Sequence, residues 1–212
     1  MKKFLSLFLT ITLCSTFYFP SFASSPSFSD VPADQWYHTW VTEAAGQGWV
    51  SGVGGGKYEP GKPVTFSQFT IMLSKALYAN DFATQPAGAK WWTAACEVAD
   101  RHGLFKDTDM ERRTDWDTVA GTSIEREQMA QMMYNALTET GAKLPSYNEY
   151  SEVVLGINDF MDVENGDAVA VCYAIKLLSG NGNGYFAPPR PHDQSTSGGG
   201  AVQYLWIRHR QR

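Results

Sequence analysis

A glycine-rich segment occurs twice in this chain, and its recurrence constrains the fold more than any other feature. Residues 52–60 and residues 180–188 place three glycines, an aromatic residue and a proline in the same register, 128 positions apart. Glycine supplies the positive φ that a chain needs where a helix stops and reverses. The residue before a proline is then kept out of helix. Two copies with matching flanks predict a repeat protein.

Apolar residues at helical spacing predict two helices in each copy. In the first copy, one helix opens at Trp36 and ends near Gln47, and its inward face includes Val41, Ala44, Ala45 and Trp49. A second helix begins at Thr65, because Thr65 and Gln68 form a capping box. Its apolar stripe is Phe69, Met72, Leu73, Ala76 and Leu77.

Both helices recur along the chain. The first-type helix returns 55 residues later, opening at Trp91 and Trp92, and returns again just before residue 180. The second-type helix returns 60 residues later, with the stripe Met129, Met132, Met133, Ala136 and Leu137. Its start has two alternatives: a capping box at 122–125, or the repeat register, which sets 125–128 opposite 65–68.

These patterns predict an all-α fold of three helix-loop-helix copies that share one core, since no copy carries enough apolar area to stand alone. The expected boundaries are 24–79 for the first copy, 80–90 for an unpatterned connector, 91–142 for the second copy and 143–212 for the third. The segment from 144 to 166 is poorly patterned, although 160–163 repeats the Phe-x-Asp-Val of 28–31. The third copy is degenerate at its last helix, which ends in Arg208 and His209, and the chain is expected to be truncated there.

The first 23 residues are expected to be a secretory signal peptide. A basic start, an apolar run and a small-residue exit ending at Ala23 form that pattern, and the run is short for a membrane span. Without Lys2 and Lys3 the chain keeps 15 basic and 22 acidic side chains, a net charge of −7. Such a surface makes nucleic acid an unfavourable partner, and no membrane contact is expected once the signal is removed.

Few other residues carry chemistry. Cys96 and Cys172 remain after signal removal, and they are either a disulfide pair or two small apolar residues on inward helix faces, with the second reading favoured. Asp107 and Asp109 fall at calcium-loop spacing, but Arg112 stands where an EF-hand needs glycine. No nucleophile or zinc motif occurs, so we expect neither an enzyme nor a cofactor or metal.

The order of these motifs resembles the S-layer homology (SLH) module of bacterial surface proteins. That module has a Phe-x-Asp-Val start, an aromatic-led helix, a Gly-x-Gly-x-Gly-x-Phe-x-Pro loop and a second helix opening with Thr-Arg-Ala-Glu. Residues 28–31, 36–37, 52–60 and 65–68 match in the first copy, and the helices match in the others. The resemblance implies a pseudo-threefold spindle that binds a secondary cell-wall polysaccharide on peptidoglycan, often one with pyruvate ketals, at the surface of a bacterium.

The resemblance also implies where the glycan binds. A helix N-terminus with free amides and an Arg is a carboxylate site. The Arg slot holds Phe66, Arg126 and Gly198 in the three copies, so Arg126 is expected to be the anion contact, or else a solvated first-turn residue. Trp36 and Trp92 are expected to contact sugar or to pack in the core, with the core favoured. The expected glycan-binding residues are Asp30, Trp36, Gly52, Gly54, Thr65, Gln68, Arg126, Gln128, Gly180 and Gly182.

Two functions therefore follow from the sequence. The first is a secreted wall-binding module that attaches through a glycan. The alternative is a structural or protein-interaction module with a surface-protein partner, which keeps the fold but has lost glycan binding because two Arg slots are vacant.

Overall fold

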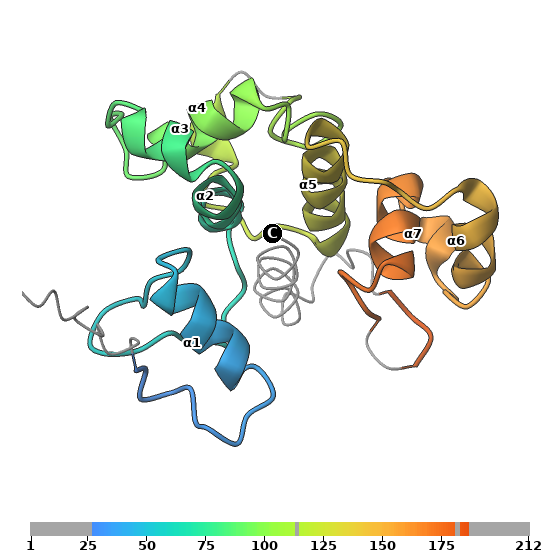
Figure 1. Ribbon diagram of the computed structural model, residues 1–212, viewed down its shortest axis with the longest axis horizontal. Helices are drawn as coiled ribbons and strands as arrows, with labels where there is room; N and C mark the ends of the chain where they lie inside the picture. The colour runs from blue at the N-terminus through green and yellow to red at the C-terminus, as the bar shows by residue number, and fades with distance from the viewer. Residues whose placement is uncertain (1–26, 113–114, 181–182, 187–212) are drawn as a thin grey trace, which may run out of the picture.

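The structure is a computed structural model, and it describes residues 27–112, 115–180 and 183–186. Within these ranges the chain forms helices and no strand, apart from two isolated bridges, so the predicted all-α class is confirmed (Figure 1). The helices are α1 (His38–Gly46), α2 (Phe66–Leu77), α3 (Ala79–Thr84), α4 (Thr93–Arg101), α5 (Arg126–Glu139), α6 (Tyr147–Val154) and α7 (Gly166–Ala174). Two single 3-10 turns, η1 (Trp116–Thr118) and η2 (Phe160–Asp162), complete the set. In these described ranges, no helix is long and apolar enough to cross a bilayer.

The three first-type helices, α1, α4 and α7, end in the same way. After each helix a residue takes a left-handed conformation: Gly48, Gly103 and Lys176, with φ of 74°, 67° and 60°. The next amide donates to a carbonyl five residues back, in each case at 2.8 to 2.9 Å, which is the Schellman motif. The shared ending supports three copies in the predicted register. The third copy uses a lysine where glycine is preferred, at a cost of roughly 1 kcal/mol.

The second-type helices begin where the repeat register places them. Thr65 caps α2, and the Thr65–Gln68 capping box is present in both directions. Glu125 occupies the N-cap position of α5, so the register at 125–128 is right and the alternative box at 122–125 does not start the helix. The predicted stripes of both helices are buried, with Ala76 half-buried. The third second-type helix, the signal peptide and Gly182 lie outside the described residues.

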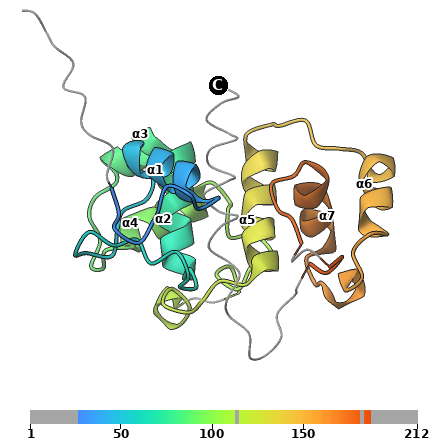
Figure 2. The ribbon, with the colours of Figure 1, turned by 90° about the horizontal axis from the view of Figure 1, so that it is seen from below.

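The copies exchange helices instead of packing within themselves. Helix α4 of the second copy packs against α2 of the first, and α7 of the third copy packs against α5 of the second. Figure 2 shows α5 standing between the α1–α4 part and the α6–α7 part. Buried residues of all three copies form one hydrophobic cluster, as expected for units too small to fold alone. The largest fully buried side chains include Phe69, Leu73, Leu104, Met129, Met132 and Phe186.

Two helices were not predicted. Helix α3 occupies much of the expected connector at 80–90, and α6 lies in the segment thought to be unpatterned. A recognisable signal preceded α6, because Ser146 and Glu149 form a capping box. Helix α3 carries no buried residue and no capping side chain, so no sequence pattern marks it.

The two cysteines of the described chain are free. Cys96 and Cys172 are both fully buried in helices α4 and α7, as the apolar reading predicted. Burial raises the pKa of each thiol to about 12, so neither is a reactive thiolate at neutral pH.

Candidate functional site

Asp30 holds the first glycine loop closed. Its carboxylate accepts hydrogen bonds from the amides of Tyr58 and Glu59, each at 2.8 Å. The Tyr58 amide is the main cause of a lowered pKa for Asp30, and the other amides and Lys57 act in the same direction against partial desolvation. The loop is therefore clamped to the start of the first copy by an ionised side chain, and Asp30 acts on the backbone of its own chain.

The third copy repeats this clamp, but one residue type earlier than the sequence indicated. Asp159 accepts from the amide of Phe186 at 2.7 Å, and the amide of Asn158 donates to Gly184 at 2.7 Å. In the first copy the amide of Ser29 donates to Gly56 at 2.9 Å in the same way. Residues 157–160 are thus the counterpart of 28–31. The proposed match of 160–163 is wrong, because Met161 is 93% exposed and its neighbours form a 3-10 turn instead of the clamp.

The loop glycines have structural reasons for their identity. A Cβ on Gly52 would stand 2.4 Å from the carbonyl oxygen of Lys57, and one on Gly180 would stand 2.4 Å from that of Tyr185. Gly54 has a φ of 107°, which side chains rarely allow. These three expected glycan-binding residues therefore shape the loop, whatever else they contact.

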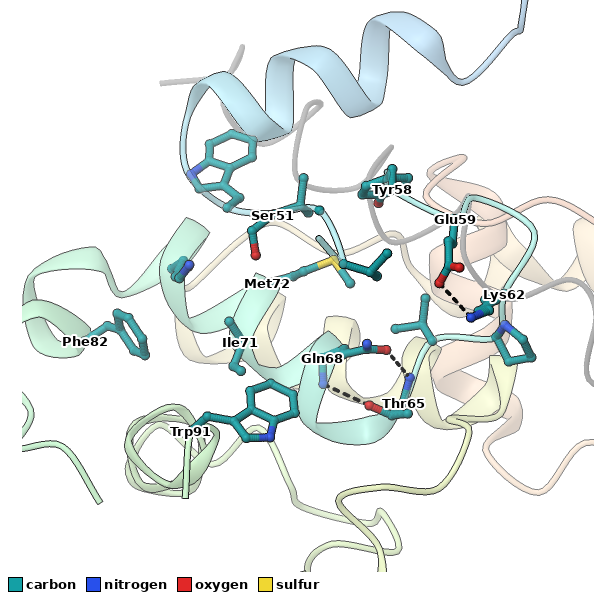
Figure 3. Close-up of a pocket in the computed structure, with 17 residues that line it drawn as sticks. Ser51, Tyr58, Glu59, Lys62, Thr65, Gln68, Ile71, Met72, Phe82 and Trp91 are labelled. Atoms are coloured by element: carbon teal, nitrogen blue, oxygen red, sulfur yellow. Dashed lines mark hydrogen bonds and ion pairs between the residues drawn. The ribbon is translucent and has the colours of Figure 1, made fainter. Parts of the chain in front are cut away.

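A groove of about 770 Å³ lies between the first copy and the start of the second (Figure 3). The loop of the first copy forms one wall, helix α2 contributes a stripe along its length, and Trp91 of the second copy closes the far side. Its aromatic members are Trp49, Tyr58, Phe82 and Trp91. Its polar members are Ser51, Glu59, Lys62, Thr65, Gln68 and Lys75. Three of the expected residues, Gly52, Thr65 and Gln68, are brought together here.

The amides at the start of α2 are already used. Phe66 N–H donates to the carbonyl of Thr122 at 3.1 Å, and Ser67 N–H donates to that of Ala120 at 3.0 Å. Gln68 N–H donates to the Thr65 hydroxyl at 3.3 Å. The expectation of free helix amides that take a carboxylate is therefore wrong for α2. The groove offers side chains to a ligand, and α2 offers no open N-terminus.

Arg126 points to the third copy. Its Nη2 donates to the carbonyl of Ser179, and its guanidinium lies 5.0 Å from the ring centroid of Phe186. Burial lowers the pKa of Arg126, while the nearby Tyr173 and Asp159 act in the opposite direction. The structure thus brings Arg126 and the Gly180 loop together. The guanidinium fastens that loop to α5, so the solvated first-turn alternative is wrong; its role as an anion contact stays a prediction.

The boundary between the second and third copies is closed by side chains. Glu127 and Gln128 are both buried, and the Glu127 carboxylate accepts from the amides of Glu164 at 2.9 Å and Asn165 at 3.5 Å. Gln128 accepts from the amide of Asp109 at 2.9 Å and donates to the Asn165 side chain at 3.3 Å. In the repeat register these residues correspond to Ser67 and Gln68, and there the boundary is open.

Sequence analysis missed the most exposed tryptophan. Trp92, one of the two considered, is buried at the N-cap of α4, as the core reading favoured. Trp91 is 69% exposed and lines the groove. Trp36 is 66% exposed, so its packing in the core is wrong; it contacts Tyr37 edge-on and does not line the groove, and its contact with sugar stays a prediction. The Trp36–Tyr37 and Trp91–Trp92 pairs recur 55 residues apart, a pattern that marks the first member as the outward one.

Comparisons with known proteins agree with this architecture. A model of the S-layer homology domain matches residues 27–70. An endoglucanase of Bacillus sp. (strain KSM-635) is 27% identical over 224 residues, covering 97% of this chain and 22% of that protein. An amylopullulanase of Thermoanaerobacterium thermosulfurigenes is 27% identical, covering 84% and 10%. An S-layer protein of Bacillus thuringiensis subsp. finitimus is 29% identical over 112 residues, covering 50% and 14%. The chain spans less than a quarter of each of these relatives.

Proposed function

Because the chain is an S-layer homology protein, with the family's domain at residues 27–70, we propose that it anchors to the bacterial cell wall by binding a wall polysaccharide in the groove between its first and second copies. Anchoring at the cell surface is the function that the S-layer relatives and the domain have in common with it. The polysaccharide, its location on peptidoglycan and the secretion of the chain belong to the proposal.

The groove has the chemistry that sugars need. A sugar ring presents apolar C–H faces and a rim of hydroxyls, so it pairs well with an exposed aromatic ring beside polar side chains. The Trp91 indole supplies the ring, and Thr65 and Gln68 supply hydroxyl and amide groups on the opposite side (Figure 3). The single observation that carries the proposal is this exposed indole, held over a polar stripe of the neighbouring copy.

The other expected site residues take supporting places in the proposal. Asp30, Gly52 and Gly54 shape the loop wall of the groove. Arg126, Gln128 and Gly180 lie at the boundary of the second and third copies, where Glu127 and Gln128 close the space. We therefore place the first binding event at the first groove and not at Arg126.

Sedimentation with purified wall sacculi tests the proposal. The protein is expected to sediment with intact walls and to stay in solution with walls stripped of their secondary polymer. Trp91→Ala should lower the affinity for intact walls by roughly tenfold, since the contact of one aromatic ring with a sugar face is worth about 1 to 1.5 kcal/mol. Tyr147→Ala is the matched control, because Tyr147 is 70% exposed on α6, away from the groove.

Two results would reject the proposal. Equal sedimentation with stripped walls would show that the polymer is not the ligand. Absence of sedimentation with any wall would favour the alternative, a protein-interaction module, and surface cross-linking would then be expected to recover a protein partner.

A further inference from the structure

The groove carries one unpaired positive charge. Glu59 and Lys62 line one edge and neutralise each other in an ion pair of 2.7 Å. Lys75 lines the groove as well, is half-buried, and has no ion-pair partner in the described part of the chain. The chain as a whole has a net charge of −5. A lone cation in a groove of an acidic protein is therefore a local exception in sign.

Lys75 stands in line with the polar residues of the groove. Thr65, Gln68, Met72 and Lys75 follow one face of α2 at helical spacing, and all four line the groove. Thr65 and Lys75 are ten residues apart, roughly 15 Å along a helix axis. That length exceeds a single sugar ring, so a chain of sugars lying along α2 would reach from the capping box to the ammonium group. Phe82 and Trp91 also line this groove.

No other residue of the first copy is placed to supply this charge. The position expected to hold arginine is Phe66, which is 2% exposed and packed in the core. Arg126 is turned to Ser179 and Phe186 in the third copy. The amides of Phe66 and Ser67 are taken by carbonyls of the second copy.

We infer that Lys75 is the anion contact of the groove, so that the first copy selects a polysaccharide with a carboxylate or phosphate substituent through a lysine in the last turn of α2. This inference rests on the proposed function. Lysine binds an anion as a point charge without the bidentate geometry of arginine. The contact is thus tolerant of the anion's shape, and its strength should depend on salt because the ammonium is partly solvated.

The experiment measures binding of the full chain to intact walls and to soluble wall polymer released by hydrofluoric acid, a treatment that cleaves phosphodiesters and keeps carboxylates. Lys75→Gln is expected to weaken binding to walls by about fivefold to tenfold at low salt. Lys75→Arg should bind within about twofold of the parent protein. Lys106→Gln is the matched control, because Lys106 is exposed outside the groove and loses the same charge.

The polymer arms identify the anion. A Lys75 effect that persists on the released polymer and disappears when its carboxylates are amidated with a carbodiimide identifies a carboxylate. An effect seen on walls and lost on the released polymer identifies a phosphate. If the parent protein sediments with walls while Lys75→Gln binds as well as Lys106→Gln, the inference is overturned and the proposed function stands. If the parent protein does not bind walls at all, both are overturned.

Discussion

Gly52 and Gly180 owe their identity to a steric contact that recurs at equivalent places. In each copy the loop returns across the glycine so closely that a carbonyl oxygen stands 2.4 Å from where a Cβ would be. The separation of 128 residues could be read directly from the sequence, because glycine is the only residue that fits such an approach. The binding role first attached to these glycines did not follow from that argument.

Gly52→Ala should therefore destabilise the fold. The added methyl would also meet the Phe28 ring at 2.7 Å, so the loop or the ring must move, and we expect a loss of about 2 to 4 kcal/mol in the free energy of unfolding. Urea denaturation measures this loss. Gly61→Ala is the control, because nothing lies within 4 Å of its Cβ position and its φ is ordinary, and it should change stability by less than about 1 kcal/mol. Equal losses for the two variants would contradict the steric account.

Residue-level prediction failed where the decisive partner belongs to another copy. Arg126 was assigned from its slot in the motif, but its orientation is set by Ser179 and Phe186, more than fifty residues away. Lys75 attracted no attention, since a lysine in the last turn of a helix is ordinary. Its place in the groove becomes visible only when Trp91 and α3 are packed beside α2.

At the scale of elements, the amphipathic helices were predicted well and the junctions were not. Helices α1, α2, α4, α5 and α7 follow from their apolar spacing, and the exact start of α5 follows from the repeat register. The clamp of the third copy was misplaced, because the sequence of 160–163 copies a motif whose structural role is carried by 157–160. Backbone hydrogen bonds decide such a register, and a short motif does not display them.

His102 connects four elements through side chains. It caps α4, its Nε2 lies 2.7 Å from Asp81 of α3, its Nδ1 lies 2.9 Å from Glu139 of α5, and its ring stacks on Tyr78 at the end of α2. Tyr78 also donates to Glu139 at 3.0 Å. Burial lowers the pKa of His102, but hydrogen bonds and charge from Glu139 and Asp81 outweigh it, so the net pKa is raised.

This cluster predicts a pH dependence of stability. Because the folded-state pKa of His102 is raised, the contribution of protonated His102 is complete below the unfolded value of about 6.5 and is lost as pH rises through the folded pKa. Urea midpoints measured from pH 5.5 to 8.5 should fall with rising pH for the parent protein. His102→Gln, which keeps hydrogen bonding without the charge, should flatten the curve. Parallel curves for the two proteins would contradict the assignment.

At the scale of the whole molecule, the repeat unit of the sequence differs from the packing unit of the structure. Each first-type helix packs on the second-type helix of the copy before it, as α4 does on α2 and α7 does on α5. Boundaries between copies are therefore the places where surfaces of two copies face each other. One such boundary is sealed by Glu127 and Gln128, and the other is the groove lined by Trp91. Sequence periodicity predicted that the copies share a core, but not which boundary stays open.

The central claim is that the open boundary binds the wall polysaccharide, and the indole of Trp91 reports on it directly. A ¹H–¹⁵N spectrum of the tryptophan indoles, assigned with Trp91→Phe, would be recorded during titration with wall polymer released by hydrofluoric acid. The Trp91 resonance should move and saturate, while that of Trp92, which is 9% exposed and outside the groove, should stay in place. A Trp91 resonance that stays unchanged while the polymer binds would contradict the claim.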